Sequence, residues 1–425
     1  MKIEEKAIEI LKMPVCNSCL GRQYGNLLSG LSNEERGKII REYVAMLLDS
    51  GESIDIDKNN FHGIKFRNIK IKTEKPEKCS VCKNFFRDEL ERLAKETVKK
   101  FRGIEFKTFL VGTILSNELQ RAEEEIWSQA GIEFVEPIKA EINRELGKVI
   151  ERISDKTFSS KNPDVTVLVN LQTGKIKANI RSLYVSGGYT KLVRGIPQTK
   201  WVCSSCGGKG CIACKGTGKL YKTSVQEIIE KPFLKAAKAK HSSFHGAGRE
   251  DIDARNLDYR PFVIEILQPE KRKIDLKKIE RQLSKNKKVK VRKLKFCEKE
   301  LIEKLKKAKI DKTYEAEVDF EKDIDMKKLK ELKKLPSMEI HQQTPQRVVH
   351  RRADILRKRA VRSIVWKLKG KRKIVFKIRA ESGLYIKELI NGDEGRTEPN
   401  VAEVLNNKVK KINLDVIKIH TKGFT

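Results

Sequence analysis

The chain is organised around the stretch Ser242-Ser243-Phe244-His245-Gly246-Ala247-Gly248-Arg249-Glu250-Asp251-Ile252-Asp253-Ala254-Arg255. Its small residues, Gly246 to Gly248, allow the backbone to turn sharply and let a ligand approach closely. Three carboxylates and two guanidiniums follow, and the apolar segment Arg260–Ile266 then predicts a strand. A solvated loop of surface ion pairs is the ordinary interpretation of such a cluster. The alternative is a reactive carboxylate that neighbouring arginines keep ionised, and the rest of the chain decides between the two.

The composition predicts a protein of several domains that binds a polyanion. The chain has 425 residues, 39% of them apolar, which is enough for two to four domains with a sizeable core. Lysine and arginine number 92 against 58 aspartates and glutamates, a net charge of +34. This excess favours a nucleic-acid partner over a membrane surface. Because the sequence has no run of 18 apolar residues and begins with a charged segment, we expect no membrane span and a cytoplasmic location.

Eight of the nine cysteines fall into pairs with the spacing C-x-x-C. The four pairs are Cys16/Cys19, Cys79/Cys82, Cys203/Cys206 and Cys211/Cys214, and Cys297 stands alone. In an intracellular chain such pairs predict metal ligands rather than disulfides, and four thiolates suit tetrahedral zinc. We expect two structural Zn²⁺ sites, one shared by the first two pairs and one by the last two. Two unrelated knuckles or a redox pair are the alternatives for the first two pairs.

The patterning predicts four regions along the chain. Helical spacing of apolar residues around the first two cysteine pairs predicts a zinc-binding helical region, and a predicted hairpin across Gln172-Thr173-Gly174 lies in a small α/β domain. A polar connector, Lys191–Trp201, leads into the last two cysteine pairs, and one strongly basic domain follows. The predicted boundaries are 1–100, 101–195, 196–223 and 224–425.

The basic domain contains a tract with an extreme excess of positive charge. Residues 346–379 hold fourteen lysines or arginines and one acid, Asp354, with apolar residues interleaved. A solvated helix face is the ordinary interpretation of such a tract. Because charge balance and solubility do not require an excess of this size, the tract predicts a surface that contacts phosphates.

The second region resembles the THUMP domain, an RNA-binding module of tRNA-modifying enzymes. The resemblance rests on Phe109–Thr113, Asn162–Val165 and Arg181–Tyr189. Its composition taken alone predicts only a small α/β domain.

Three stretches of the basic domain together resemble the motifs of pseudouridine synthases. They are Arg249-Glu250-Asp251, the predicted strand Lys312–Val318 with its tyrosine, and the apolar-basic-x-apolar segment within Arg379–Leu389. The whole chain is similar to the archaeal and eukaryotic synthase family that acts on the TΨC arm of tRNA, at positions 54 and 55. The similarity extends from Cys16–Arg22 to Gly395–Asn400 and includes Arg194–Thr199, Gly248–Arg255 and Thr344–Asp354. The last two cysteine pairs resemble the archaeal branch.

The resemblance implies an α/β (α+β) fold, in which a zinc-bearing, THUMP-containing accessory domain precedes a mixed-sheet catalytic domain. It assigns Asp251 as the essential carboxylate, which reaches the sugar as a nucleophile or takes a proton. Asp253 is the rival, but only Asp251 stands two residues after an arginine. Lys387 is expected to pair with Asp251 and keep it ionised.

The same resemblance assigns residues to the substrate. Tyr314 is expected to stack on the turned-out base and to assist proton removal, and Tyr385 to line the same pocket. Arg249 would occupy the space of the flipped nucleotide or contact its phosphate, and Leu389 would pack under the base.

Two other function classes compete with this interpretation. A zinc-stabilised RNA chaperone would explain the charge and the cysteines, but not the ordered set Asp251, Tyr314 and Lys387. A THUMP-bearing methyltransferase should carry a glycine-rich nucleotide loop that opens an apolar helix, whereas charges follow Gly248. We therefore expect a tRNA-binding isomerase, monomeric by default, that needs no cofactor for catalysis.

Overall fold

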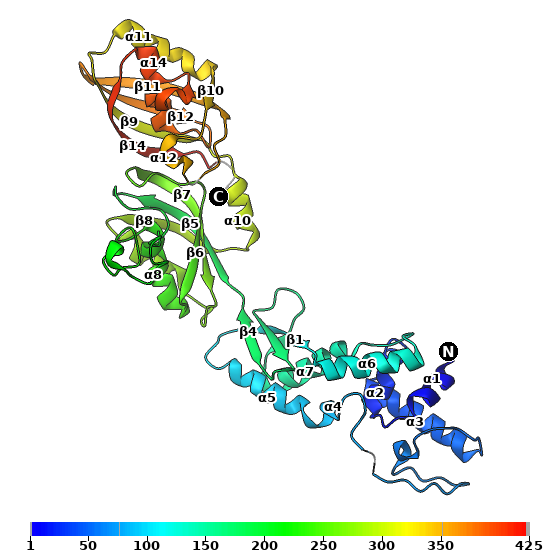
Figure 1. Cartoon of the computed structure of the whole chain (residues 1–425). Helices are drawn as coiled ribbons and strands as arrows, with labels where there is room; N and C mark the ends of the chain where they lie inside the picture. Colours follow the sequence, from blue (N-terminus) through cyan, green and yellow to red (C-terminus); the bar gives the residue numbers. More distant parts are fainter. Residues whose placement is uncertain (1, 76, 351, 422–425) are drawn as a thin grey trace. The chain divides into compact units, whose positions relative to one another are not determined.

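The computed structural model describes residues 2–75, 77–350 and 352–421. The chain separates into two compact units, Met1–Arg181 and Ser182–Thr425, which contain the blue-to-cyan and the green-to-red parts of Figure 1. Within the described residues, no helix is both long and apolar enough to cross a membrane.

The first unit is built from helices and one small sheet. Its elements are α1 (Ile3–Ile10), α2 (Asn17–Arg22), α3 (Asn33–Asp49), the 3₁₀ turn η1 (Lys58–Phe61), α4 (Phe85–Asp88), α5 (Leu90–Lys100), β1 (Thr108–Ile114), α6 (Asn117–Ala130), α7 (Ile138–Ser154), β2 (Thr157–Phe158), β3 (Val165–Asn170) and β4 (Ile176–Ile180). The sheet has the order β2-β1-β3-β4, with β1 parallel to β2 and β3. The predicted hairpin is confirmed, because β3 and β4 pair antiparallel with Val165 opposite Ile180.

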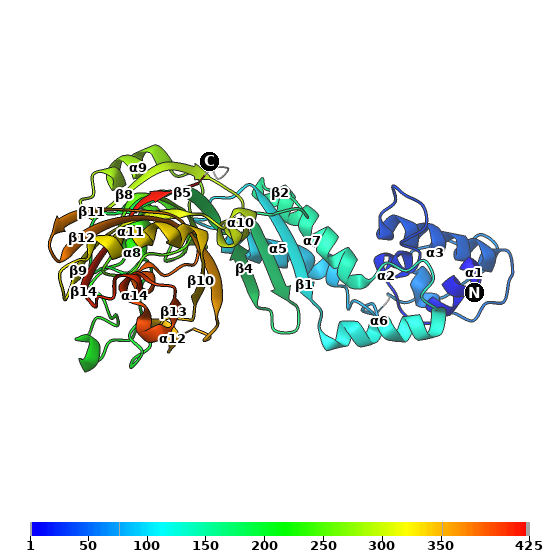
Figure 2. The same ribbon diagram turned by 90° about the horizontal axis from the view of Figure 1, so that it is seen from above.

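Local sequence signals explain these elements. Ser32 and Glu35 form a capping box at the start of α3, in which the Ser32 hydroxyl accepts from the Glu35 amide at 3.2 Å and the Glu35 carboxylate accepts from the Ser32 amide at 2.8 Å. Alternate residues of β1 are buried, as expected for a strand that packs on one face. Helices α5 and α7 lie against the sheet (Figure 2), and their apolar residues join the core of this unit.

The second unit contains one large mixed sheet. Its elements are β5 (Leu183–Lys191), η2 (Ile212–Cys214), α8 (Val225–Ala237), β6 (His241–Gly246), β7 (Arg255–Leu267), α9 (Leu276–Ser284), β8 (Val289–Phe296), α10 (Glu300–Lys307), β9 (Lys312–Phe320), α11 (Met326–Glu331), η3 (Leu332–Ser337), β10 (Glu339–Gln342), α12 (Gln346–Val349), β11 (Arg357–Gly370), β12 (Lys373–Ala380), α13 (Ile386–Asn391), η4 (Asp393–Gly395), β13 (Thr397–Glu398), α14 (Val401–Leu405) and β14 (Val409–Ile419). The described strands form the order β13-β10-β11-β12-β9-β14-β7-β5-β8, and β6 pairs with β7. Strands β7 and β14 are parallel at Arg255–Asp415, which joins the two halves of the sheet.

Strand β5 belongs to this large sheet. The sequence placed Leu183–Lys191 at the end of the 101–195 region, but β5 pairs antiparallel with β7 and β8. A strand's own alternation shows which face is buried and not which strand is its partner, so the sequence pattern could not place it. The four region boundaries stay predictions, whereas the two compact units divide after Arg181.

Each half of the large sheet has its own apolar cluster. Helices α8 and α9 pack around β5, β7 and β8, with Phe233, Phe262 and Val289 fully buried. At the other half, α13 and α14 pack with β9, β12 and β14 around Phe376 and Leu389. The β6–β7 turn, Ala247–Ala254, lies between these clusters, so the loop singled out in the sequence stands where the two halves meet.

Candidate active site and metal centres

A cavity of about 480 Å³ opens beside the β6–β7 turn. Its size falls within the range of small-ligand pockets, roughly 300–1,000 Å³. The described residues that line it are Gly248, Arg249, Glu250, Asp251, Ala254, Lys312, Tyr314, Arg347, Val348, Arg352, Arg357, Ser382, Gly383, Leu384, Tyr385, Ile386, Leu414 and Val416. All three motifs found in the sequence contribute, so the structure brings together segments that lie up to 137 residues apart, from Arg249 to Ile386.

The Asp251 carboxylate is partly exposed to this cavity and contacts two cations. The Arg347 guanidinium donates from Nη1 to its Oδ1 at 3.0 Å. The Lys387 ammonium lies 3.6 Å from its Oδ2. Both contacts suit an ionised carboxylate, since an opposite charge at this range favours the charged form.

The expected pair between Lys387 and Asp251 is present, but Lys387 lies closer to the rival carboxylate. Its ammonium is 2.7 Å from Asp253 Oδ2. Burial would raise the pKa of Asp253, but the hydrogen bond and charge of Lys387 outweigh it and lower that pKa. Lys387 is therefore shared by both aspartates, and Arg347 makes the closer contact with Asp251.

Tyr314 on β9 is one of the residues that line the cavity. Burial raises the pKa of Tyr314 to about 12, so the hydroxyl keeps its proton at neutral pH. Lys312, two residues earlier on the same face of β9, is also buried, and burial lowers its pKa to about 8. The strand thus presents a neutral phenol and a lysine of weakened basicity.

Tyr385 is surrounded by arginines of the basic tract. The guanidinium carbons of Arg347, Arg352 and Arg357 lie 5.8, 5.9 and 6.0 Å from its ring centroid, and Arg352 donates a hydrogen bond to its hydroxyl. Such distances are within the range of cation–π contacts. The first part of the tract predicted from charge therefore lines the cavity itself.

Two further predicted site residues, Arg249 and Leu389, differ in their relation to the cavity. The guanidinium carbon of Arg249 lies 5.3 Å from the ring centroid of Trp201. Leu389 is fully buried in the apolar cluster of α13 and is not part of the cavity wall, where Leu384 and Ile386 stand instead. Its expected place under the base stays a prediction.

Sequence reasoning missed Arg347 and its second partner, Glu388. The Glu388 carboxylate is almost fully buried and accepts from Arg347 Nε at 2.6 Å. Burial lowers the pKa of Arg347, but the hydrogen bonds and charges of Glu388 and Asp251 raise it overall. Glu388 therefore holds the guanidinium that contacts Asp251. The only sequence signal was the position of Arg347 within the basic tract, which did not single it out.

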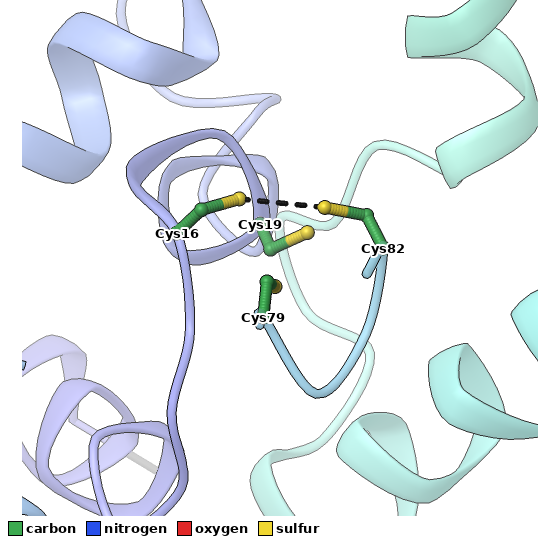
Figure 3. A group of neighbouring side chains, drawn as sticks. All are labelled: Cys16, Cys19, Cys79 and Cys82. Atoms are coloured by element: carbon green, nitrogen blue, oxygen red, sulfur yellow. Dashed lines mark hydrogen bonds between the residues drawn. The ribbon is translucent and has the colours of Figure 1, made fainter. Parts of the chain in front are cut away.

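The first two cysteine pairs meet in one cluster. The thiol sulfur atoms of Cys16, Cys19, Cys79 and Cys82 lie within 4.8 Å of one another, and those of Cys16 and Cys82 are 3.6 Å apart. Figure 3 shows the four side chains pointing toward a common centre. Zn–S bonds of about 2.3 Å in a tetrahedron place sulfurs about 3.8 Å apart. The cluster therefore fits a tetrahedral metal ion, and the predicted sharing of one site by two distant pairs is confirmed as a geometric arrangement.

Close helix packing positions this cluster. A Cβ on Gly21 of α2 would lie 1.8 Å from the Asn33 carbonyl, and a Cβ on Gly37 of α3 would lie 1.9 Å from the Asn17 carbonyl. Glycine at both positions lets α2 and α3 touch backbone to backbone. The start of α2, which carries Cys16 and Cys19, is fixed by this contact.

The last two pairs form a second, compact cluster. The sulfur separations are 3.9 Å for Cys203–Cys211, 3.9 Å for Cys206–Cys214 and 3.7 Å for Cys211–Cys214, again the spacing of a tetrahedral site. Backbone amides of Gly210 and Gly218 point at Cys206 and Cys214 sulfurs from 3.2 and 3.1 Å, which suits thiolate ligands. Both clusters could hold a metal ion.

Comparison with known proteins decides the family. The model of the family described as "Pus10, C-terminal" matches residues 184–420, and the model described as "Pus10 THUMP domain, archaeal" matches residues 93–170. A tRNA pseudouridine synthase Pus10 of Methanothrix thermoacetophila is 40% identical over 97% of this chain and 93% of its own length. The Pus10 of Methanocaldococcus jannaschii is 41% identical over 97% of this chain and 93% of its own length.

This chain belongs to the Pus10 family. It is a pseudouridine synthase, an isomerase, and the expected α/β fold with a THUMP domain before a mixed-sheet catalytic domain is confirmed. This family membership favours the synthase over the chaperone and methyltransferase alternatives. A Cbf5–Nop10–Gar1 complex is similar over 55% of this chain and 48% of its own, at 17% identity, but its TM-score of 0.30 supports no argument.

Within this Pus10 chain the cavity lies wholly in the part that matches the C-terminal family model, and the first cysteine cluster precedes the matched THUMP region. The catalytic match begins at residue 184, just after β5 begins. The family boundary and the boundary between the compact units therefore nearly coincide.

Proposed function

We propose that this chain isomerises uridine to pseudouridine in the TΨC arm of tRNA, at positions 54 and 55, with Asp251 acting on a flipped-out uridine. The observation that carries the proposal is the meeting of Asp251, Tyr314 and Tyr385 in one cavity of about 480 Å³. The relatives named tRNA pseudouridine synthase support tRNA as the substrate.

The reaction conserves composition. The bond from ribose C1′ to N1 of uracil breaks, the base turns, and C1′ bonds to C5. The proton on C5 leaves and N1 gains a proton, so no oxidant, reductant or further reactant is consumed. The reaction therefore requires one oriented carboxylate, a surface that holds the detached uracil while it turns, and a group that accepts the C5 proton.

Asp251 supplies the carboxylate. It either attacks the sugar or takes a proton from it, and both roles require the ionised form. Arg347 at 3.0 Å and Lys387 at 3.6 Å support that form. Asp253 has a different role, because its carboxylate is largely exposed and binds Lys387.

Tyr314 supplies the surface for the base. With a pKa of about 12, its phenol is a donor in the resting enzyme and not a phenolate base. Tyr314 can therefore assist removal of the C5 proton only by passing on its own proton at the same time. Stacking on the turned base is its main role in this proposal.

Flipping the nucleotide costs a few kcal/mol, and the arginines around the cavity offset this cost through phosphate contacts. Tyr385, with three arginines around its ring, holds the turned-out nucleotide. Arg249 leaves the Trp201 ring to fill the vacated place in the RNA or to contact its phosphate. Leu389 supports the cavity only indirectly, because it packs in the apolar cluster that holds α13.

The proposal includes tRNA as partner, a monomer as the working form and the cytoplasm as location. The match to the archaeal THUMP model supports a role for residues 93–170 in holding a second part of the tRNA.

The two cysteine clusters are proposed as structural Zn²⁺ sites. When bound, zinc would crosslink α2 to the turn before α4 in the first cluster, and would hold the 203–214 segment in the second. Metal analysis of the purified protein should find about two zinc ions per chain. Cys79→Ser should remove one of them and leave the other, and a different metal or an unchanged count would contradict the assignment.

Release of tritium from tRNA labelled at uracil C5 tests the function. The wild-type protein should release tritium in proportion to the pseudouridine formed, and Asp251→Asn should release none while binding tRNA nearly as well. Binding should persist because phosphate contacts dominate affinity. Substantial turnover by Asp251→Asn would remove Asp251 from its proposed role.

A further inference from the structure

The polar segment Lys191–Gln198, which the sequence presents only as a connector, lies along the buried side of the β6–β7 turn. Lys191 ends β5 and is fully buried. Its ammonium donates to the carbonyl of Asp251 at 2.9 Å and to that of Ile252 at 3.2 Å. The ammonium also donates to the Ile196 carbonyl at 3.0 Å, a hydrogen bond within the segment itself. The lysine thus binds the backbone of the proposed nucleophile directly.

Further hydrogen bonds join the same segment to other backbone carbonyls of the turn. Arg194 donates from Nη1 to the Asp253 carbonyl at 2.6 Å and to the Leu414 carbonyl at 2.8 Å. The Gly195 amide donates to the Ile252 carbonyl at 2.8 Å. Gln198 donates to the Gly248 carbonyl at 2.9 Å. One short segment therefore binds the turn before, at and after Asp251.

Buried charge holds the remaining part of the turn. The Glu250 carboxylate accepts from the Tyr189 hydroxyl at 2.9 Å and pairs with Arg260 Nε at 3.1 Å. Arg260 also donates to the Ala247 carbonyl at 3.0 Å. Because Glu250 is anchored inward, its neighbour Asp251 is presented to the cavity.

We propose that Lys191, Arg194 and Gln198 are positioning residues that fix the Asp251 carboxylate against the reacting sugar by binding the backbone of its turn. This inference rests on the proposed function of Asp251. All three partners of the Lys191 ammonium in the described chain are backbone carbonyls, two of them in the catalytic turn. Burial lowers the pKa of Lys191 to about 8, because the ammonium loses hydration inside the protein.

Orientation matters because a displacement of about 1 Å at a reacting group lowers the rate by about 100-fold. Replacing Lys191 with methionine keeps the length of the side chain and removes the three donors. We expect Lys191→Met to lower kcat for pseudouridine formation by roughly 30- to 100-fold, with KM for tRNA within about twofold. Amide hydrogen exchange of the 249–253 backbone should accelerate. Lys191→Arg, which keeps the charge and several donors, should recover part of kcat.

The matched control is Lys6→Met. Lys6 is also buried and donates only to carbonyls, those of Gly131 at 3.1 Å and Glu133 at 2.8 Å, far along the chain from the turn. This substitution should leave kcat at saturating tRNA unchanged. If Lys191→Met does not fold, Gln198→Met removes the hydrogen bonds to the Gly248 carbonyl and the Tyr189 hydroxyl and should lower kcat by a smaller factor with KM unchanged.

Two results would overturn the inference. One is a kcat for Lys191→Met within threefold of wild type. The other is a loss of tRNA affinity and thermal stability in Lys191→Met that fully accounts for the lost rate, with no recovery in Lys191→Arg. If the wild-type protein itself formed no pseudouridine in tRNA, the proposed function would fail instead, so the two failures are distinguishable.

Discussion

Each compact unit contains a buried arginine beside a buried glutamate, and the two pairs have the same shortest nitrogen–oxygen distance but different geometry. Arg22 Nη1 donates a hydrogen bond to Glu141, whereas Arg260 Nε contacts Glu250 as an ion pair without hydrogen-bond geometry. Arg22 Nη1 lies 3.1 Å from Glu141 Oε2, and Arg260 Nε lies 3.1 Å from Glu250 Oε2, with all four side chains nearly or fully inaccessible. Arg22 joins α2 to α7 and lies 3.5 Å from the Cys19 sulfur. Arg260 joins β7 to the turn that carries Asp251.

The comparison shows that the interaction itself does not reveal its function. Breaking either pair removes the closest carboxylate from a buried arginine, and the loss of a buried partner costs about 3–5 kcal/mol in known cases. Arg22 would still have the Glu123 carboxylate at 3.9 Å. The expected consequences differ because one pair holds a cysteine-bearing helix and the other holds the turn that carries Asp251. Substitutions in the two pairs should therefore have similar effects on stability and different effects on chemistry.

The largest effect is expected for Glu250→Gln. The amide keeps the shape of the side chain and can still accept from Tyr189, but it leaves the Arg260 charge unbalanced. We expect kcat to fall by about 100-fold or more through loss of orientation, with KM for tRNA little changed. Single-turnover assays beside urea unfolding would measure both quantities. A loss of stability with normal kcat would remove the distinction between the pairs.

A comparable loss of stability without loss of chemistry is expected for Glu141→Gln. The first unit should be destabilised by about 3 kcal/mol, since Arg22 stays buried while its closest carboxylate is gone. Turnover on a short TΨC stem-loop should not change, because the substituted residue lies outside the catalytic unit. Parallel melting and stem-loop assays on Glu250→Gln provide the control, and a matching fall in kcat would contradict the account.

The smallest of these effects is expected on removing the first unit. The cut belongs after Arg181, because a cut near residue 190 would delete β5 from the large sheet. The remaining chain should bind whole tRNA about tenfold more weakly and with a shallower salt dependence, because fewer phosphates are contacted. Binding to an isolated TΨC stem-loop should change much less. Equal affinity of both proteins for whole tRNA would show that the first unit is not an RNA anchor.

The sequence predicted the features that depend on residues close together in the chain. The C-x-x-C pairs indicated both metal clusters because thiolates at that spacing share a metal, and the four thiols of each cluster do lie together. The Arg249-x-Asp251 motif indicated the turn that lines the cavity. These signals are short and depend little on distant contacts.

Partnerships between distant segments could not be predicted. Arg347 is 96 residues from Asp251, and nothing in a tract of fourteen basic residues distinguishes it from its neighbours. The preference of Lys387 for Asp253 depends on side-chain geometry at 2.7 against 3.6 Å. Leu389 has the apolar pattern of both a cavity wall and a core, and only the packing of α13 places it in the core.

We propose that the Asp251 cavity forms pseudouridine in the TΨC arm. The most direct test maps pseudouridine at single-nucleotide resolution in unmodified tRNA transcripts treated with wild type, Asp251→Asn or Asp253→Asn. The account predicts modification at positions 54 and 55 by wild type, none by Asp251→Asn and substantial modification by Asp253→Asn. Modification outside the TΨC arm, or activity that requires Asp253 and not Asp251, would contradict it.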